Sequence, residues 1–147
     1  MFATANRAIN AYANVGLETG VEAADPHKLV LMLYDGALLA LNDARTHMNN
    51  HAIAAKGQAL SKAIQIIGCG LRESLDTKAG GELGERLGAL YDYMCDRLLR
   101  ANLHNRVEII DEVSKLLIEL RNAWAQIKPA GADASGGFPK APMTGKA

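Results

Sequence analysis

The stretch that decides the fold is LVLMLYDGALLAL, residues 29–41, which is more apolar than a surface helix requires. At about 100° per residue, this stretch and the residues after it form one continuous apolar stripe that is expected to face a core. The stripe consists of Val30, Leu33, Tyr34, Ala37, Leu41, Ala44 and Met48. Met32 and Leu39 point the other way, and Leu31 and Leu38 lie on a third side. Either the rest of the chain or a partner must therefore cover the surplus apolar surface.

Three further segments show the same helical spacing. Asp25 and Pro26 can cap and open the first helix, which is expected to end near His51. A second helix is predicted from Ile53 to Leu75, and the polar DTKAGG at 76–81 is expected to be a loop. A third helix ends at 102–105, and a fourth runs from 106 until Pro129 stops it. Their stripes are Ile53, Gly57, Leu60, Ile64, Ile67, Leu71 and Leu75; Leu83, Leu87, Leu90, Met94, Leu98 and Ala101; and Ile109, Val113, Leu116, Leu117, Leu120, Trp124 and Ile127.

These patterns predict an all-α protein, an antiparallel up-and-down four-helix bundle with an N-terminal arm or short helix. The chain has 147 residues, of which 49% are hydrophobic and only 5% aromatic, which is enough apolar material for one helical core. We expect residues 1–24 to form the arm and residues 25–128 the bundle. Residues 129–147, rich in Gly, Pro, Ser and Ala, are expected to be a disordered tail.

Charge and hydropathy exclude several classes of function. The formal net charge is zero, so the basic surface that nucleic-acid binding needs is absent. Asp35 interrupts the longest apolar run, which is too short to cross a membrane. The first residues do not have the pattern of a secretory signal, so a cytosolic location is expected. There Cys69 and Cys95 would remain thiols and act as small packing residues.

Motifs that carry catalysis or bind metals and cofactors are also missing. No Glu-x-x-His pair suited to a di-metal bundle occurs, and no further ligand near His47 and His51 completes a metal site. A histidine phosphotransfer module would be a rival four-helix function. It needs Lys-Gly at a fixed short spacing after an exposed histidine, and Lys56-Gly57 lies two residues too far from His51. The sequence therefore predicts neither an enzyme nor a cofactor.

Apolar residues beyond the core stripes point instead to binding. Helical spacing places Met32, Leu39, Ile66, Tyr91 and Leu99 off the main stripes, and the helical glycines Gly84 and Gly88 allow a close approach by another backbone. One interpretation is a set of grooves for amphipathic helices of another protein. The alternatives are that these residues face the N-terminal arm or that they form a structural homodimer.

Three stretches resemble one family, the flagellar secretion chaperones called FliS. They are AYANVGLETGVEAADPHKLVLMLYDGAL at 11–38, GGELGERLGALYDYM at 80–94 and ELRNAW at 119–124. Taken in this order they are highly specific, and the resemblance covers about residues 6–128. The low-complexity tail has no counterpart in it.

The resemblance implies a cytoplasmic bundle that binds the disordered C-terminal segment of flagellin and prevents its premature polymerisation. It also implies delivery to the flagellar type III export apparatus through the cytoplasmic domain of the export gate FlhA. Whether other flagellar regulators bind as well is a question that the sequence leaves open. Ile9 and Tyr12 would belong to an N-terminal lid over part of the binding surface, although Tyr12 could equally be a permanent packing residue. The contact residues predicted for the client are Met32, Leu39, Ile66, Gly84, Gly88, Tyr91 and Leu99.

Overall fold

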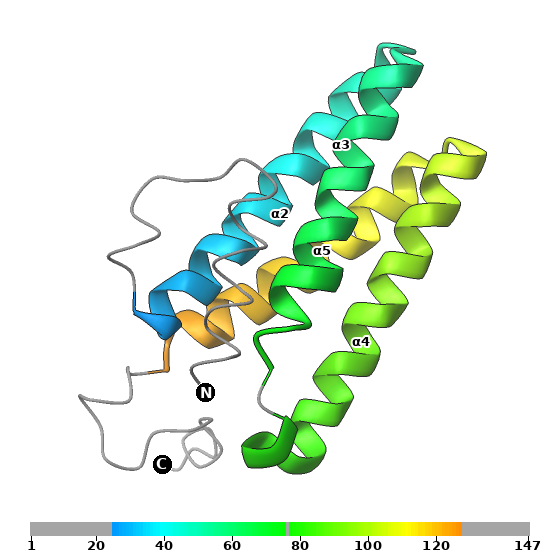
Figure 1. Ribbon diagram of the computed structural model, residues 1–147. Coiled ribbons are helices and arrows are strands. Elements are labelled where there is room, and N and C mark those ends of the chain that lie inside the picture. The colour runs from blue at the N-terminus through cyan, green and yellow to red at the C-terminus, as the bar shows by residue number, and fades with distance from the viewer. Residues whose placement is uncertain (1–24, 76, 128–147) are drawn as a thin grey trace.

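The computed structural model describes residues 25–75 and 77–127 as an all-helical bundle (Figure 1). The elements are α2 (Pro26–Asn49), α3 (Ile53–Gln65), the π-helix η2 (Ile66–Leu71), α4 (Thr77–His104) and α5 (Val107–Ala125). Helix α2 packs against α3 and α5, and α4 packs against the same two helices, so each helix borders the hydrophobic core. The predicted fold class is confirmed. The predicted arm with Ile9 and Tyr12, and the predicted tail, lie outside the described residues.

Helix α2 begins and ends as its sequence predicts. The Asp25 carboxylate accepts a hydrogen bond from the Lys28 amide at 2.7 Å, and Pro26 occupies the first helical position. The helix ends at Asn49, two residues before the predicted end, and His51 then adopts a positive φ of 60° in the turn to α3. The buried residues on this helix include most of the predicted stripe: Leu33, Tyr34, Ala37, Leu41, Ala44 and Met48.

The prediction of one regular helix over residues 53–75 is wrong, because the last part is a π-helix. The Arg72 amide donates to the Ile67 carbonyl at 2.9 Å, a bond that spans five residues instead of four. Ile66 and Ile67, at the start of this segment, are both fully buried. The buried residues of α3 before them are Lys56, Leu60 and Ala63, so the core face is centred on these residues and not on the predicted stripe through Gly57 and Ile64. Ile66, which a regular helical wheel places outside the core stripe, therefore has no exposed surface in this structure.

The predicted loop at 76–81 is also corrected. Helix α4 begins at Thr77, and a kink at Gly81 separates its first turn from the rest. Gly81 has φ 56° and ψ −131°, a conformation that residues with a Cβ rarely adopt. The paired glycines therefore mark a bend inside a helix.

A hydrogen bond between two phenols joins α2 to α4 in the core. The hydroxyl oxygens of Tyr34 and Tyr91 lie 2.6 Å apart, and both side chains are buried. Burial raises the pKa of both groups, so both remain neutral at physiological pH. Tyr91, predicted to belong to an outer strip, is instead part of the core, where its hydroxyl has found a partner.

Lys56 of α3 is buried beside the C-terminal end of α4. Its ammonium group donates to the Asn102 carbonyl at 3.1 Å and to the Asn105 side-chain oxygen at 2.6 Å. The C-terminus of a helix carries partial negative charge and unpaired carbonyls, so this contact ties α3 to the last turn of α4.

Polar contacts close two of the seams between helices. Arg121 binds Asp35 and Arg45 binds Asp111 across α2 and α5, each at 2.8 Å. Across α4 and α5, the Glu112 carboxylate accepts hydrogen bonds from Arg97 at 3.0 Å and from the Tyr93 hydroxyl at 2.5 Å.

The start of α2 and the end of α5 also meet in an aromatic contact. The rings of His27 and Trp124 stack with centroids 5.2 Å apart, and the Trp124 indole nitrogen donates to the His27 carbonyl at 2.9 Å. The ELRNAW stretch thus anchors the C-terminal end of α5 to the first turn of α2. None of the described helices combines the length and apolar character needed to cross a membrane.

Candidate binding surface

Large apolar side chains remain on the outside of a bundle whose core is already filled. Leu39 on α2 and Leu99 on α4 are each 57% exposed, Ile53 at the start of α3 is 70% exposed, and Leu103 on α4 is 75% exposed. The other exposed large hydrophobic residues in the described ranges are Leu83, Tyr93 and Ile118. Isolated exposed leucines are common in proteins, so their position relative to one another matters more than their number.

Leu99 and Leu103 are both exposed on α4. They are four residues apart and therefore share one face of α4. Asn102, adjacent to Leu103, lines a surface cavity whose other residues all belong to α3. Neither Leu99 nor Leu103 lines this hollow itself.

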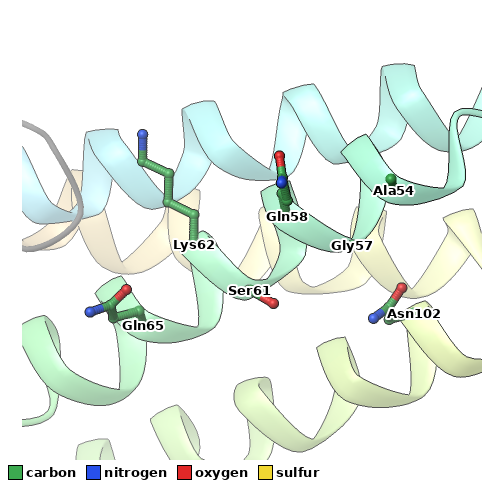
Figure 2. Close-up of a pocket in the computed structure, with 7 residues that line it drawn as sticks. All are labelled: Ala54, Gly57, Gln58, Ser61, Lys62, Gln65 and Asn102. Carbon is green, nitrogen blue, oxygen red and sulfur yellow. The ribbon is translucent and has the colours of Figure 1, made fainter.

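This hollow is shallow and open to solvent; its volume of about 560 Å³ lies over the outer face of α3 (Figure 2). Figure 2 shows the Ser61 side chain turned toward α4 and the Lys62 side chain projecting on the other side of α3. Gly57, labelled on the ribbon one turn before Ser61, adds no side chain to this surface. The lining consists of Ala54, Gly57, Gln58, Ser61, Lys62, Gln65 and Asn102. These small, amide and hydroxyl groups suit a peptide that also supplies polar atoms.

The structure separates the predicted contact residues into three groups. Leu39 and Leu99 are exposed, as a binding surface requires, and Met32 is half-buried against the core. Ile66 and Tyr91 are buried within the bundle for the reasons given above. The structure therefore does not bring all of these residues into one site.

Gly84 and Gly88, the two glycines predicted as contact residues, are buried as well. A Cβ placed on Gly88 would lie 2.4 Å from a guanidinium nitrogen of Arg72, whose Nε donates to Asp92 at 3.1 Å. Arg72 thus crosses α4 directly above Gly88. The close approach predicted at this glycine is made by a side chain of the same chain.

Sequence reasoning missed several exposed residues. Ile53 and Leu83 were assigned to core stripes, yet both are exposed, because each lies in the first turns after a chain reversal, beyond the packed part of the bundle. Leu103 was not singled out, although its spacing of four from Leu99 is a signal that could have found it. The cavity over α3 had no sequence signal, because Gly57 was placed on the core stripe.

No cluster of three or more potential metal ligands is found among the residues that the structure describes. Cys69 and Cys95 are free thiols, and burial is the main cause that raises the pKa of Cys95 to about 11. The Cys95 thiol is therefore protonated at neutral pH and a poor nucleophile.

These features define a class of protein: a helical bundle with a complete core and an apolar outer surface, suited to binding a partner. The family model described as "Flagellar protein FliS" matches residues 8–131. A flagellar secretion chaperone FliS of Salmonella typhimurium is 50% identical over 121 residues, which cover 82% of this chain and 90% of the relative. The flagellar secretion chaperone FliSB of Pseudomonas aeruginosa is 45% identical over 120 residues, covering 82% of this chain and 94% of the relative.

A more distant relative, the flagellar secretion chaperone FliS of Bacillus subtilis, is 36% identical over 109 residues, which cover 74% of this chain and 80% of the relative. The chain belongs to the FliS family, so the resemblance drawn from the three sequence stretches is confirmed. Membership of this family supports a flagellar export chaperone role and not an enzymatic one.

Proposed function

We propose that this protein is a cytoplasmic export chaperone that binds the disordered C-terminal segment of flagellin, prevents its premature polymerisation and delivers it to the flagellar type III export apparatus. The observation that carries the proposal is the exposure of Leu39, Leu99 and Leu103 on a bundle whose core needs none of them. Family membership supplies the class of client, and the exposed leucines supply the surface.

The binding energy would come from apolar burial as the client folds. Segments that fold on binding bury on the order of 1,000 to 3,000 Å². At about 25 cal/mol per Å² of apolar area, such burial can offset the entropy that the segment loses when it becomes helical. A client helix whose apolar face lies on the chaperone cannot use the same face in a filament, so binding and polymerisation exclude each other. This mechanism requires no nucleotide.

Delivery would use a second contact, with the cytoplasmic domain of the export gate FlhA. In this scheme Ile9 and Tyr12 belong to an N-terminal arm that lies over part of the client surface and gives way to the client. Other flagellar regulators that present amphipathic helices would use the same surface. The region that the family model matches begins at residue 8 and so includes Ile9 and Tyr12.

The test is calorimetry of the full chain with a peptide that spans the last part of flagellin. We expect binding at micromolar concentration or tighter, a strongly negative heat-capacity change and a gain in helicity measured by circular dichroism. Leu99→Glu and Leu103→Glu should weaken binding at least tenfold, because each places a charge in a surface that the client buries. Asn122→Glu, at an exposed position of α5, is the matched control and should bind like the wild type.

Two results would contradict the proposal. The first is an absence of binding at micromolar concentration. The second is a stable dimer in light scattering that takes up no flagellin peptide, which would favour a structural homodimer that hides its own apolar surface.

A further inference from the structure

A second hollow lies at the end of the bundle where two turns meet. The turn from α2 to α3 and the turn from α4 to α5 lie at the same end of the molecule (Figure 1). The hollow between them has a volume of about 370 Å³, and both turns contribute residues to its lining. It shares no lining residue with the shallow hollow over the outer face of α3. It is therefore a separate feature of the surface.

Lys56 gives this hollow a buried cation without a counter-ion. The residue lines the hollow, yet only 4% of its surface is exposed. Its ammonium group has three N–H donors. The two acceptors already described, the Asn102 carbonyl and the Asn105 side-chain amide oxygen, are both neutral. The ion pairs among the described residues do not include Lys56.

Burial distinguishes Lys56 from other lysines of the chain. Lys28, Lys62 and Lys115 reach solvent, so water solvates their charge. A buried charge, by contrast, is normally paired with an opposite charge, because water no longer solvates it fully. One N–H donor and the whole positive charge of Lys56 are therefore available to a ligand in the hollow.

Two helices begin at this hollow without a side-chain cap. Ile53 is the first residue of α3, Val107 is the first residue of α5, and both line the hollow. No side-chain cap bonds to either helix within the described part of the chain. The amides of a first helical turn carry partial positive charge and attract anions. Glu108, in the first turn of α5, pairs with Arg106 at 2.7 Å and does not line the hollow.

The carbonyls at the helix C-termini of this end already have donors. The amides of residues 50–52 donate to carbonyls in the last turn of α2 at 2.9 to 3.1 Å. At the end of α4, the Arg106 amide donates to the Ala101 carbonyl at 3.1 Å, and Lys56 binds the next carbonyl along. His47 and His51 add two imidazoles that can donate N–H groups, and the lining contains no Asp or Glu. The hollow therefore suits an anion.

We propose that this hollow binds a carboxylate that carries a small apolar group. The carboxylate lies near Lys56 and the first amides of α3, and the apolar group packs against Ile53 and Val107. The apolar walls favour such a ligand over an inorganic anion, which is polar on every side. The carboxylate belongs either to a free organic acid or to the carboxyl terminus of a polypeptide. This site goes beyond the proposed chaperone function and does not depend on it.

The probe is N-acetyl-leucine, titrated into the isotope-labelled full chain while the backbone amide chemical shifts are recorded. We expect saturable shifts at Ile53, Ala54 and Val107. N-acetyl-leucine amide has the same shape without the charge and should bind at least tenfold more weakly. Inorganic phosphate has charge without the apolar group and should also bind at least tenfold more weakly.

A peptide distinguishes the two sources of the carboxylate. N-acetyl-alanyl-alanyl-leucine presents the same terminal residue at the end of a chain. Tighter binding of this peptide than of N-acetyl-leucine identifies a polypeptide terminus as the ligand. Equal or weaker binding identifies a free acid.

The decisive variant is Asn49→Asp, because it places a fixed carboxylate in the lining at an exposed position. We expect N-acetyl-leucine to bind at least tenfold more weakly to this variant. Asn122→Asp, an exposed position in the last turn of α5, makes the same change near another helix C-terminus and should bind normally.

A second variant tests the imidazole of His51. This residue has a positive φ of 60°, so His51→Gly removes the ring at a position whose backbone conformation suits glycine. We expect binding several-fold weaker and a thermal midpoint equal to or above that of the wild type. Lys56→Met removes the central charge and also a contact with α4, so a loss of binding counts only if circular dichroism shows the variant folded.

Three results would overturn the inference. The first is the absence of saturable shifts at the hollow with millimolar N-acetyl-leucine. The second is equal binding of N-acetyl-leucine and its amide, which would mean that no group of the hollow recognises the carboxylate. The third is binding of phosphate as tight as that of N-acetyl-leucine, which would mean that the apolar walls contribute nothing. The chaperone proposal is unaffected by any of these results.

Discussion

The seam between α2 and α5 is closed by side-chain contacts, whereas the outer face of α3 is open to solvent. Two long-range ion pairs, formed by Arg121 and Arg45, and the stacking of His27 on Trp124 close the α2–α5 seam. The outer face of α3 has a shallow hollow and a glycine, Gly57, with no atom within 4 Å of an added Cβ. It also carries Lys62, which has no ionic partner among the described residues. The contrast indicates that different surfaces hold the bundle together and leave room for a partner, so variants should affect stability and binding separately.

The largest effect is expected from breaking the closed seam. Trp124→Ala removes the ring that stacks on His27 and the indole donor to the His27 carbonyl, and it leaves a hole beside the core residues that Trp124 packs against. The loss in unfolding free energy should be about 3 kcal/mol, as for other aromatic-to-alanine changes at packed sites. Trp124 is the only tryptophan, so denaturation should be followed by circular dichroism.

If the comparison holds, folded Trp124→Ala should still bind the flagellin peptide with an affinity close to that of the wild type at a temperature well below its midpoint. A loss of binding greater than tenfold in the folded variant would show that the α2–α5 seam belongs to the client surface.

An intermediate effect should distinguish two glycines. Gly57→Ala is expected to stabilise the chain by about 0.5 to 1 kcal/mol, because alanine has the higher helix propensity and its Cβ meets open space. Gly88→Ala should give no such gain, because its Cβ would force Arg72 aside and weaken the contact with Asp92. Urea denaturation of both variants measures the difference. Equal stabilisation by the two substitutions would mean that Arg72 moves aside at no cost in stability and that the two glycine positions do not differ.

The smallest effect concerns the ion pair across α4 and α5. The hydrogen bond from Tyr93, followed by the contacts with Arg97, holds the pKa of Glu112 below its ordinary value of 4.5. A carboxylate with a lowered pKa in the folded state contributes stability above pH 4.5, and this contribution disappears as the pH falls through the folded-state pKa.

Glu112→Gln should therefore be slightly less stable than the wild type at pH 7, by less than about 1 kcal/mol for a partly exposed pair. The two proteins should converge in strongly acidic solution, as judged by urea midpoints across the pH range. Glu119→Gln, at an exposed position of the same helix, controls for the loss of a surface charge. If the two proteins still differ in stability at a pH where the Glu112 carboxyl of the wild type is protonated, the effect comes from packing and not from charge.

The sequence predicted the number of helices in the bundle and the capped start of the first one. These features depend on local signals: Asp25 and Pro26 cap α2, and the stripe from Leu33 to Met48 repeats at the helical period. Ile66 and Tyr91 were misplaced because a helical wheel assumes a constant phase and ignores neighbours. The core face of α3 is centred on Leu60 and Ala63, which brings Ile66 inside, and Tyr34 on another helix gives Tyr91 a buried partner.

The candidate site was predicted only in part, for a related reason. Leu39 and Leu99 were identified because they deviate from an apolar stripe, a property visible along one helix. The open space at Gly57 and the contact of Arg72 with Gly88 both depend on how separate elements pack, which the pattern along one helix does not show.

By itself, the sequence determined the helical class, the approximate order of the elements and the family, because caps, period and motif order are local along the chain. Only the tertiary structure decided which apolar residues are hidden, which of the described glycines remains open and which charged groups pair. Exposure is a property of the distances between helices, and those distances result from side chains far apart in the sequence packing together.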